Sequence, residues 1–232
     1  MKILPALTSI IPNLWREKVQ EINALGLVEV AVFPTGLDYS ERRELYGLLE
    51  KSCLKQIPFM HLREEDMPEA ELDYLVERWG LEKCNVHPRD VILEDAYLPK
   101  YRGIIYVENS AEFLEEKYLK GFAGLCIDFS HLENDRRLSV KCYDQVIRLA
   151  EKYPVGCGHA SAVYQKLVDK RLDGSPEKHE RFDGHYADSE KCFDYLKSYP
   201  EKLLPPVLAI EVENSLTEQL KFKKYIREML NI

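Results

Sequence analysis

The chain has 232 residues, of which 45% are hydrophobic and 31% are charged, and its formal net charge is -8. This composition excludes the low hydrophobicity and high charge of disordered chains, and the negative charge gives no general attraction to nucleic acid or to an anionic membrane. No apolar run approaches the roughly 18 residues of a membrane span, and the N-terminal residues lack a signal-peptide pattern, so we expect a cytoplasmic protein with no membrane partner. The six scattered cysteines show no metal-binding spacing and are expected to be reduced thiols.

Short apolar segments alternate with helical patterns along the whole chain, which is typical of successive strand–helix units around a parallel sheet. We expect eight strands, at Ile3–Thr8, Val28–Pro34, Ile57–Leu62, Lys83–His87, Gly103–Glu108, Gly124–Phe129, Val155–His159 and Val207–Glu213. Eight parallel strands favour an α/β fold of the closed (β/α)8 TIM barrel type, formed as a single domain by residues 1–232. An open doubly wound sheet stays an alternative because strand order cannot be read from one sequence, although no strand is followed by a glycine-rich dinucleotide-binding turn.

Between the strands, apolar residues at helical spacing end at Gly26 and at Gly80, which predicts two helices with glycine C-caps. Phe113 and Leu114 indicate a further helix after the fifth strand. The long polar stretch at 160–188 interrupts the regular alternation, and a loop of that length is usually functional or disordered.

Polar side chains gather at the predicted C-terminal ends of the strands, where (β/α)8 barrels place their active sites. They are His61, His87, Glu108, Asp128, His131, His159, Glu211 and Glu213. A lone strand-end histidine is more often a hydrogen-bonded structural residue than a ligand, but chance does not readily place several of them beside strand-end acids. Buried carboxylates need compensation, and mixed imidazole and carboxylate ligands suit Zn, Mn or Fe better than Ca or Mg. The pattern therefore predicts a divalent-metal site and an enzyme.

Three segments carry a resemblance to a known family: Val-His-Pro at 86–88, Val-Glu-Asn-Ser at 107–110 and Cys-Ile-Asp-Phe-Ser-His at 126–131. With them, the chain resembles the xylose-isomerase-like barrel superfamily, and within it most closely the endonuclease IV type of apurinic endonuclease. The resemblance implies a first metal held by His61, His87 and Glu108. It implies a second metal that Glu108 bridges and that is also held by Asp128, His159 and Glu211. It implies a third metal held by His131, Asp183 and His185.

In the same resemblance, Glu211 is preferred to Glu213 because Ile-Glu at the end of the last strand is similar to the family's ligand position. The cofactor implied is one to three divalent cations per chain, with Zn or Mn favoured. The acidic loop at 63–66 fits poorly beside a phosphate backbone, which puts a DNA substrate in doubt more than the metals.

Three functions are consistent with these residues. The first is an endonuclease IV-like phosphoester hydrolase that uses a metal-bridging hydroxide. The second is a sugar or sugar-phosphate isomerase or epimerase with one metal, in which Glu108 and Glu211 form the catalytic acid/base pair. The third is a non-catalytic barrel that binds a sugar or a partner. The expected partner is a small phosphorylated or sugar substrate, with damaged DNA as a further option, and the oligomeric state is left open.

Overall fold

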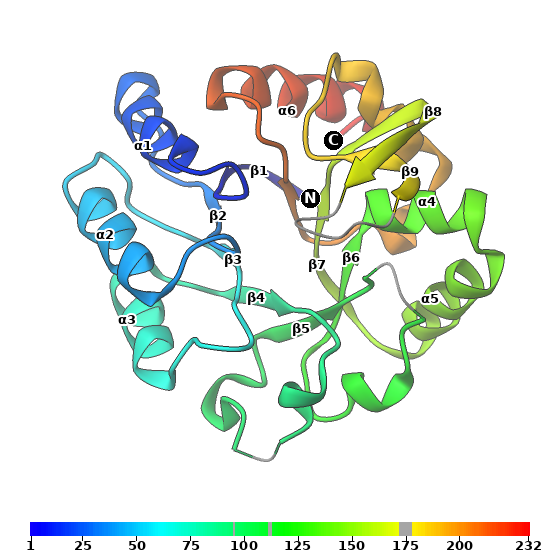
Figure 1. Cartoon of the computed structure of the whole chain (residues 1–232), viewed down its shortest axis with the longest axis horizontal. Coiled ribbons are helices and arrows are strands. Elements are labelled where there is room, and N and C mark those ends of the chain that lie inside the picture. The colour runs from blue at the N-terminus through cyan, green and yellow to red at the C-terminus, as the bar shows by residue number, and fades with distance from the viewer. Residues whose placement is uncertain (95, 111–112, 172–177) are drawn as a thin grey trace.

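The computed structural model describes residues 1–94, 96–110, 113–171 and 178–232, and eight parallel strands close into a barrel in it. Around the barrel the strands follow the order β1, β2, β3, β4, β5, β6, β7 and β10, and β10 pairs with β1 to complete the circle (Figure 1). The α/β barrel predicted from the sequence is confirmed, and the open sheet is excluded because the first and last strands are paired.

Each barrel strand overlaps a segment predicted from the sequence; β1 and β7 are one residue longer than predicted, and the other six are shorter. Their bounds are β1 Lys2–Thr8, β2 Ala31–Phe33, β3 Phe59–His61, β4 Lys83–Val86, β5 Ile105–Glu108, β6 Gly124–Asp128, β7 Val155–Ala160 and β10 Val207–Ile210. The pairing continues beyond β10, because the backbone N–H of Glu211 donates to the carbonyl of Ala160 at 2.9 Å. Glu211 is therefore held in register with β7.

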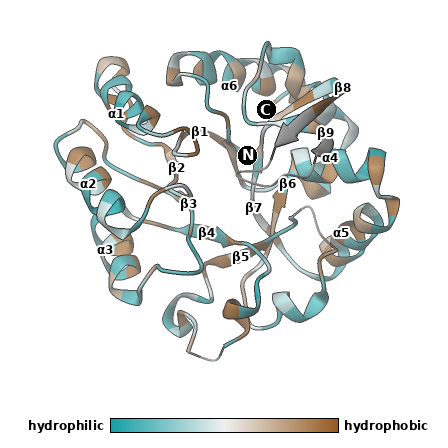
Figure 2. Cartoon of the chain, in the orientation of Figure 1, coloured by the Kyte–Doolittle hydropathy of each residue, from teal (hydrophilic) through white to brown (hydrophobic). Residues whose placement is uncertain are grey.

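In the described part of the chain six α-helices lie outside the barrel, and Figure 2 shows hydrophilic and hydrophobic residues alternating along them. They are α1 Leu14–Leu25, α2 Tyr39–Glu50, α3 Glu69–Trp79, α4 Phe129–Leu138, α5 Val140–Lys152 and α6 Leu216–Leu230. Gly26 and Gly80 take left-handed conformations at the ends of α1 and α3, as the sequence predicts. None of the helices in the described part of the chain is long and apolar enough to cross a membrane.

Short 3-10 helices replace α-helices at several connections. They are η1 Asp90–Leu93, η2 Pro99–Tyr101, η3 Glu116–Leu119, η4 Glu190–Ser198 and η5 Glu201–Leu203. The helix predicted at Phe113 and Leu114 is wrong, because neither residue is helical. The buried apolar residues here, Leu114 and Leu119, are five positions apart, a spacing that does not keep side chains on one face of an α-helix.

The polar stretch at 160–188, predicted as a loop, contains an antiparallel hairpin instead. Its strands are β8 Ala162–Arg171 and β9 Lys178–Gly184. The hairpin packs beside α4, where the amide of Asn134 accepts from the backbone N–H of Phe182 at 3.0 Å and Arg137 donates to the carbonyl of Tyr164 at 3.0 Å. These contacts attach the insertion to the middle and last turn of α4.

Apolar side chains fill both the inside of the barrel and the space between strands and helices. The outer layer on the β10 side includes Leu208, Ile210 and Val212, whereas Ala209 packs inside the barrel. This alternation along β10 matches the predicted faces. The interior cluster places an apolar floor beneath the strand ends.

Candidate metal centre

The candidate ligands form the next layer above the apolar floor. Five strands contribute a floor residue near their C-terminal ends: Phe59, Tyr106, Cys126, Cys157 and Ala209. Because side chains alternate along a strand, the residue two positions further on also points into the barrel. Those residues are His61, Glu108, Asp128, His159 and Glu211. The polar ring is therefore a direct result of strand periodicity, at the end of the barrel where active sites form.

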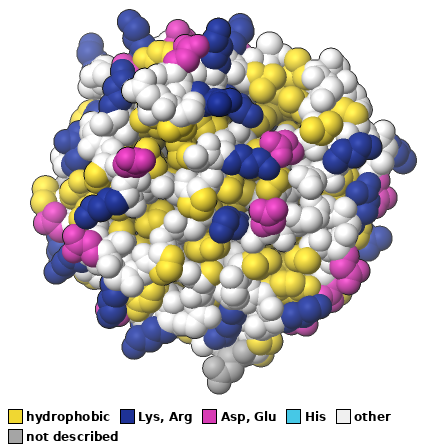
Figure 3. Space-filling model, turned by 180° about the vertical axis from the view of Figure 1, so that it is seen from behind, with side chains coloured by type: hydrophobic (Ala, Val, Ile, Leu, Met, Phe, Trp, Pro, Cys, Tyr) yellow, Lys and Arg dark blue, Asp and Glu magenta, His cyan; other side chains and the backbone are white. Residues whose placement is uncertain are grey.

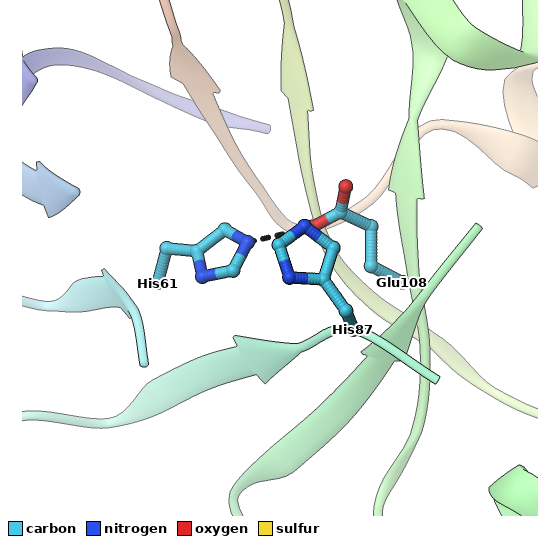
Figure 4. Close-up of side chains that lie close together, drawn as sticks. All are labelled: His61, His87 and Glu108. Atoms are coloured by element: carbon cyan, nitrogen blue, oxygen red, sulfur yellow. Dashed lines mark ion pairs between the residues drawn. The ribbon is translucent and has the colours of Figure 1, made fainter. Parts of the chain in front are cut away.

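The first candidate group consists of His61, His87 and Glu108, whose potential ligand atoms all lie within 4.8 Å of one another. Figure 4 shows the two imidazole rings reaching the Glu108 carboxylate from neighbouring strands. The Nε2 of His61 lies 3.1 Å from Oε2 of Glu108, and the two rings lie 4.5 Å apart between centroids. The Nδ1 of His61 lies 2.8 Å from the carbonyl of Leu62, which orients the ring with Nε2 toward the carboxylate.

The second candidate group consists of Glu108, Asp128 and His159, again with potential ligand atoms within 4.8 Å. The Nε2 of His159 lies 3.0 Å from Oε2 of Glu108, and its Nδ1 lies 3.5 Å from Oδ2 of Asp128. Glu211 adds a carboxylate to this group, with Oε2 at 2.7 Å from the same Nδ1. Glu108 belongs to both groups and lies between them.

Burial makes this arrangement costly without compensation. Glu108, Asp128 and His159 are each 1% exposed. Oδ2 of Asp128 and both ring nitrogens of His159 have no hydrogen-bond partner of acceptable geometry, although carboxylates or imidazoles lie close to them. Buried polar atoms of this kind cost free energy unless they are satisfied. Imidazole nitrogen and carboxylate oxygen are the donors that Zn and Mn accept, so the residues fit a divalent cation.

The charges of the two groups are strongly coupled to one another. Burial raises the pKa of Glu108, but the imidazoles of His159, His61 and His87 outweigh burial and hold that pKa well below its usual range. Burial lowers the pKa of His159, whereas Glu108, Glu211 and Asp128 together raise it well above 6.5. Burial also raises the pKa of Glu211, but His159 and His185 bring it down to about 2. The carboxylates of Glu108 and Glu211 are therefore ionised at neutral pH.

His87 lies at the edge of the first group. Burial lowers its pKa, but the carboxylates of Glu108 and Glu64 raise it to about 9. A proton on this ring must leave before the ring nitrogen can bind a cation.

The predicted third set is only partly brought together. His131, in the first turn of α4, has Nδ1 at 3.2 Å from Oδ2 of Asp128 and Nε2 at 3.5 Å from Oδ2 of Asp183. The Nδ1 of His185 lies 3.4 Å from both Oγ of Ser161 and the carbonyl of Glu211. In the described part of the chain, His131, Asp183 and His185 are not one of the groups whose ligand atoms all lie within 4.8 Å. Their role as metal ligands stays a prediction.

The two acids of the last strand end in different environments. Glu211 lies against His159, whereas Oε2 of Glu213 lies 4.0 Å from the buried ammonium group of Lys18. Both carboxylate oxygens of Glu213 lack a hydrogen-bond partner. This placement supports the choice of Glu211 as the candidate ligand.

Two residues beside the groups did not stand out in the sequence. The side-chain amide of Asn85 donates to Oε2 of Glu108 at 2.5 Å, and Asn85 is fully buried. The carboxylate of Glu64 lies 3.0 Å from Nδ1 of His87. Asn85 lies in β4, two positions before His87, so the alternation of side chains along the strand could have indicated it. Glu64 lies in an acidic loop whose sequence resembles an ordinary solvated surface.

Figure 3 shows the face opposite to the view of Figure 1, and among the side chains coloured by type no histidine is visible there. Lysine, arginine and acidic side chains are scattered over that face without a single dominant patch.

No family model matches the sequence, and no curated protein matches it. Among solved structures, the chain is similar to the HpcH/HpaI aldolase from Desulfitobacterium hafniense DCB-2, with a TM-score of 0.46 and 13% sequence identity. The similarity covers 98% of this chain and 93% of the aldolase chain. A likeness at this level carries no conclusion about the reaction.

The family assignment made from the sequence motifs is wrong. No family model matches the chain, that of the endonuclease IV type included, and the solved structure named above is described as an HpcH/HpaI aldolase and not as a xylose-isomerase-like protein. The physical reason is that motifs of three to six residues at strand ends, such as those at 86–88 and 126–131, arise wherever a barrel places histidines and acids at its mouth. The chain has a TIM barrel fold with candidate metal-binding groups.

Proposed function

We propose that this chain is a divalent-metal-dependent hydrolase that acts on a phosphoester of a small substrate, with two cations that share Glu108. The observation that carries the proposal is the membership of Glu108 in both candidate groups. A carboxylate placed between two sets of donors can neutralise two cations and fix their separation, whereas a terminal ligand serves one. Zn and Mn suit the mixture of imidazole and carboxylate donors.

The candidate ligands form two sets that share Glu108. His61 and His87 would hold the first cation, and Asp128, His159 and Glu211 would hold the second. When bound, a pair of cations supplies stabilisation of the negative charge on the attacking and leaving oxygens of a phosphoryl group. The chain's own contribution is a closely packed, buried set of donors above an apolar floor, which keeps the ligands oriented and limits water around them.

Glu211 is the candidate for proton transfer on the second side. Its carboxylate lies 2.7 Å from Nδ1 of His159, so it can hold that ring in one orientation or accept a proton from a group bound beside it. Its pKa of about 2 keeps it ionised at neutral pH.

A second candidate function is a single-metal isomerase or epimerase of a sugar or sugar phosphate. The observation that favours it is the compact set of Glu108, Asp128 and His159 with Glu211 alongside, which is sufficient for one cation and an acid/base pair. This function gives no role to His61 and His87, although both rings lie next to Glu108.

Metal stoichiometry separates the two functions. The protein is purified without chelator, saturated with Zn or Mn, freed of excess metal and analysed for metal content per chain. About two cations per chain support the hydrolase, whereas one supports the isomerase. The same sample is then assayed against aryl phosphomonoesters and phosphodiesters and against a panel of aldoses and ketoses. A folded, metal-loaded protein that turns over none of these compounds contradicts both functions.

A further inference from the structure

The loop between β3 and α3 sends one acidic side chain inward. Glu64 is 5% exposed, and its Oε1 lies 3.0 Å from Nδ1 of His87. Its neighbour Glu65 has a side chain that is 46% exposed. The loop is acidic as a whole, but the side chain of Glu64 is the one that reaches the imidazole.

Arg89, a surface residue, also contacts the carboxylate of Glu64. The Nε of Arg89 lies 2.7 Å from the same Oε1 of Glu64, and its Nη1 lies 2.8 Å from the carboxylate of Glu65. Arg89 follows His87 by two positions, so the short segment after β4 supplies both groups that contact Glu64. A buried carboxylate is stable in this position because it is paired with cationic and hydrogen-bonding groups.

The ring nitrogen of His87 that faces Glu64 determines which nitrogen is left to bind a metal. An imidazole that binds a metal through one nitrogen carries its proton on the other, and a hydrogen bond to that N–H fixes both the tautomer and the ring orientation. With Glu64 accepting from Nδ1, Nε2 of His87 is the nitrogen left to face Glu108. His61 is arranged in the same way, since its Nδ1 lies 2.8 Å from the carbonyl of Leu62 and its Nε2 faces Glu108.

The Nδ1 atoms of His61 and His87 therefore face different hydrogen-bond acceptors. A backbone carbonyl is a neutral acceptor, whereas a carboxylate makes a charge-assisted hydrogen bond and increases the basicity of the ring as a ligand. We propose that Glu64 is a positioning residue that orients His87 through Nδ1 and strengthens its binding to a divalent cation at Nε2. This role rests on the proposed metal-dependent function, which makes His87 a ligand.

The test compares three variants for their affinity for Zn²⁺, measured by competition with a chromogenic chelator. Glu64→Ala should bind the cation at the His87 side about 10 to 100-fold more weakly than the wild-type protein. Glu64→Gln, which keeps an acceptor at the same place, should recover part of that loss. Glu65→Ala is the matched control, because Glu65 also contacts Arg89 but not the imidazole, and it should bind as the wild-type protein does.

A spectroscopic readout separates positioning from a general structural effect. Protein loaded with Co²⁺ should show an altered visible absorption spectrum in Glu64→Ala and an unaltered one in Glu65→Ala, while thermal melts establish that both variants are folded. Wild-type affinity and spectrum in Glu64→Ala overturn the proposal. An equal loss in Glu65→Ala also overturns it, because the effect then passes through Arg89 rather than His87.

Failure of the proposed function gives a different result. In that case the wild-type protein itself binds no Zn²⁺ at micromolar concentrations. The NMR signal of the His87 Nδ1–H in the metal-free protein then decides whether Glu64 holds the ring, since a bonded proton gives a downfield resonance that Glu64→Ala removes. No such resonance in the wild-type protein overturns the orienting role as well.

Discussion

The Nε2 atom of His159 lies 3.0 Å from Oε2 of Glu108, in a part of the barrel where each residue is 1% exposed. A fully buried contact between these groups is stable when opposite charges face each other, and the raised pKa of His159 and lowered pKa of Glu108 have this cause. A cation that takes the place of the imidazole protons would satisfy the same carboxylate.

Metal binding should therefore release protons. The pKa of His87 is raised to about 9 by Glu108 and Glu64, against the lowering effect of burial, so this ring is protonated in the metal-free protein at neutral pH. Because a bound cation requires the deprotonated ring, affinity should rise with pH throughout the range below about 9. Isothermal titration calorimetry in buffers of different ionisation enthalpy measures the protons released. Binding without proton release near pH 7 would show that the imidazoles are not the ligands.

Asn85 should be essential for the charge balance of the site. Its amide donates to Oε2 of Glu108 at 2.5 Å, so Asn85→Asp replaces a donor with a second carboxylate at a fully buried position. Two like charges at this distance are destabilising, and one of the acids must take up a proton. The metal-free variant should melt at a lower temperature than the wild-type protein, and added Zn²⁺ should recover part of the difference. If metal-free Asn85→Asp and the metal-free wild-type protein melt at the same temperature, the amide of Asn85 is not needed for the charge balance.

The backbone before His159 leaves no room for a side chain. A Cβ at Gly158 would lie 2.7 Å from the carbonyl oxygen of Ile127, a backbone atom on the neighbouring strand. Gly158→Ala should therefore lower the free energy of unfolding by about 1 to 3 kcal/mol through overpacking, and should weaken metal binding because His159 moves with it.

Gly47 in α2 gives the matched control for this substitution, because nothing lies within 4 Å of a Cβ placed there. Gly47→Ala should raise stability by about 0.4 to 1 kcal/mol. Chemical denaturation of both variants makes the comparison. An unchanged stability in Gly158→Ala would mean that β6 and β7 are less closely packed than the distances indicate.

The barrel and most of its mouth were predictable from the sequence because both depend on short-range periodicity. Five of the strands that carry a floor residue carry a candidate ligand two positions later, as in the pairs Phe59 with His61 and Cys157 with His159. Apolar runs locate the strands, and the alternation of side chains then locates the site.

Other features depend on tertiary contacts that no local pattern reports. The hairpin of β8 and β9 lies in a stretch rich in charged residues, which favours a loop, but its strands are stabilised by pairing, by α4 and by Ala162, Val163 and Phe182, which pack into an apolar cluster. Glu64 lies in an acidic loop, and its orientation depends on Arg89 and His87, which are more than 20 positions away. The family predicted from the motifs was wrong for a related reason. A few residues at strand ends indicate the chemistry that a barrel can support, but they do not identify the family to which it belongs.

The metal content of Glu108→Gln tests most directly whether Glu108 serves both metal groups, because this substitution keeps the size of the side chain and removes its charge. Elemental analysis of metal-saturated protein, beside a thermal melt, is compared with Glu213→Gln, whose carboxylate faces Lys18 instead. We expect Glu108→Gln to remain folded and to lose at least one of two cations and nearly all activity, while Glu213→Gln keeps both cations. A folded Glu108→Gln protein with the metal content of the wild-type protein would contradict the shared role of Glu108.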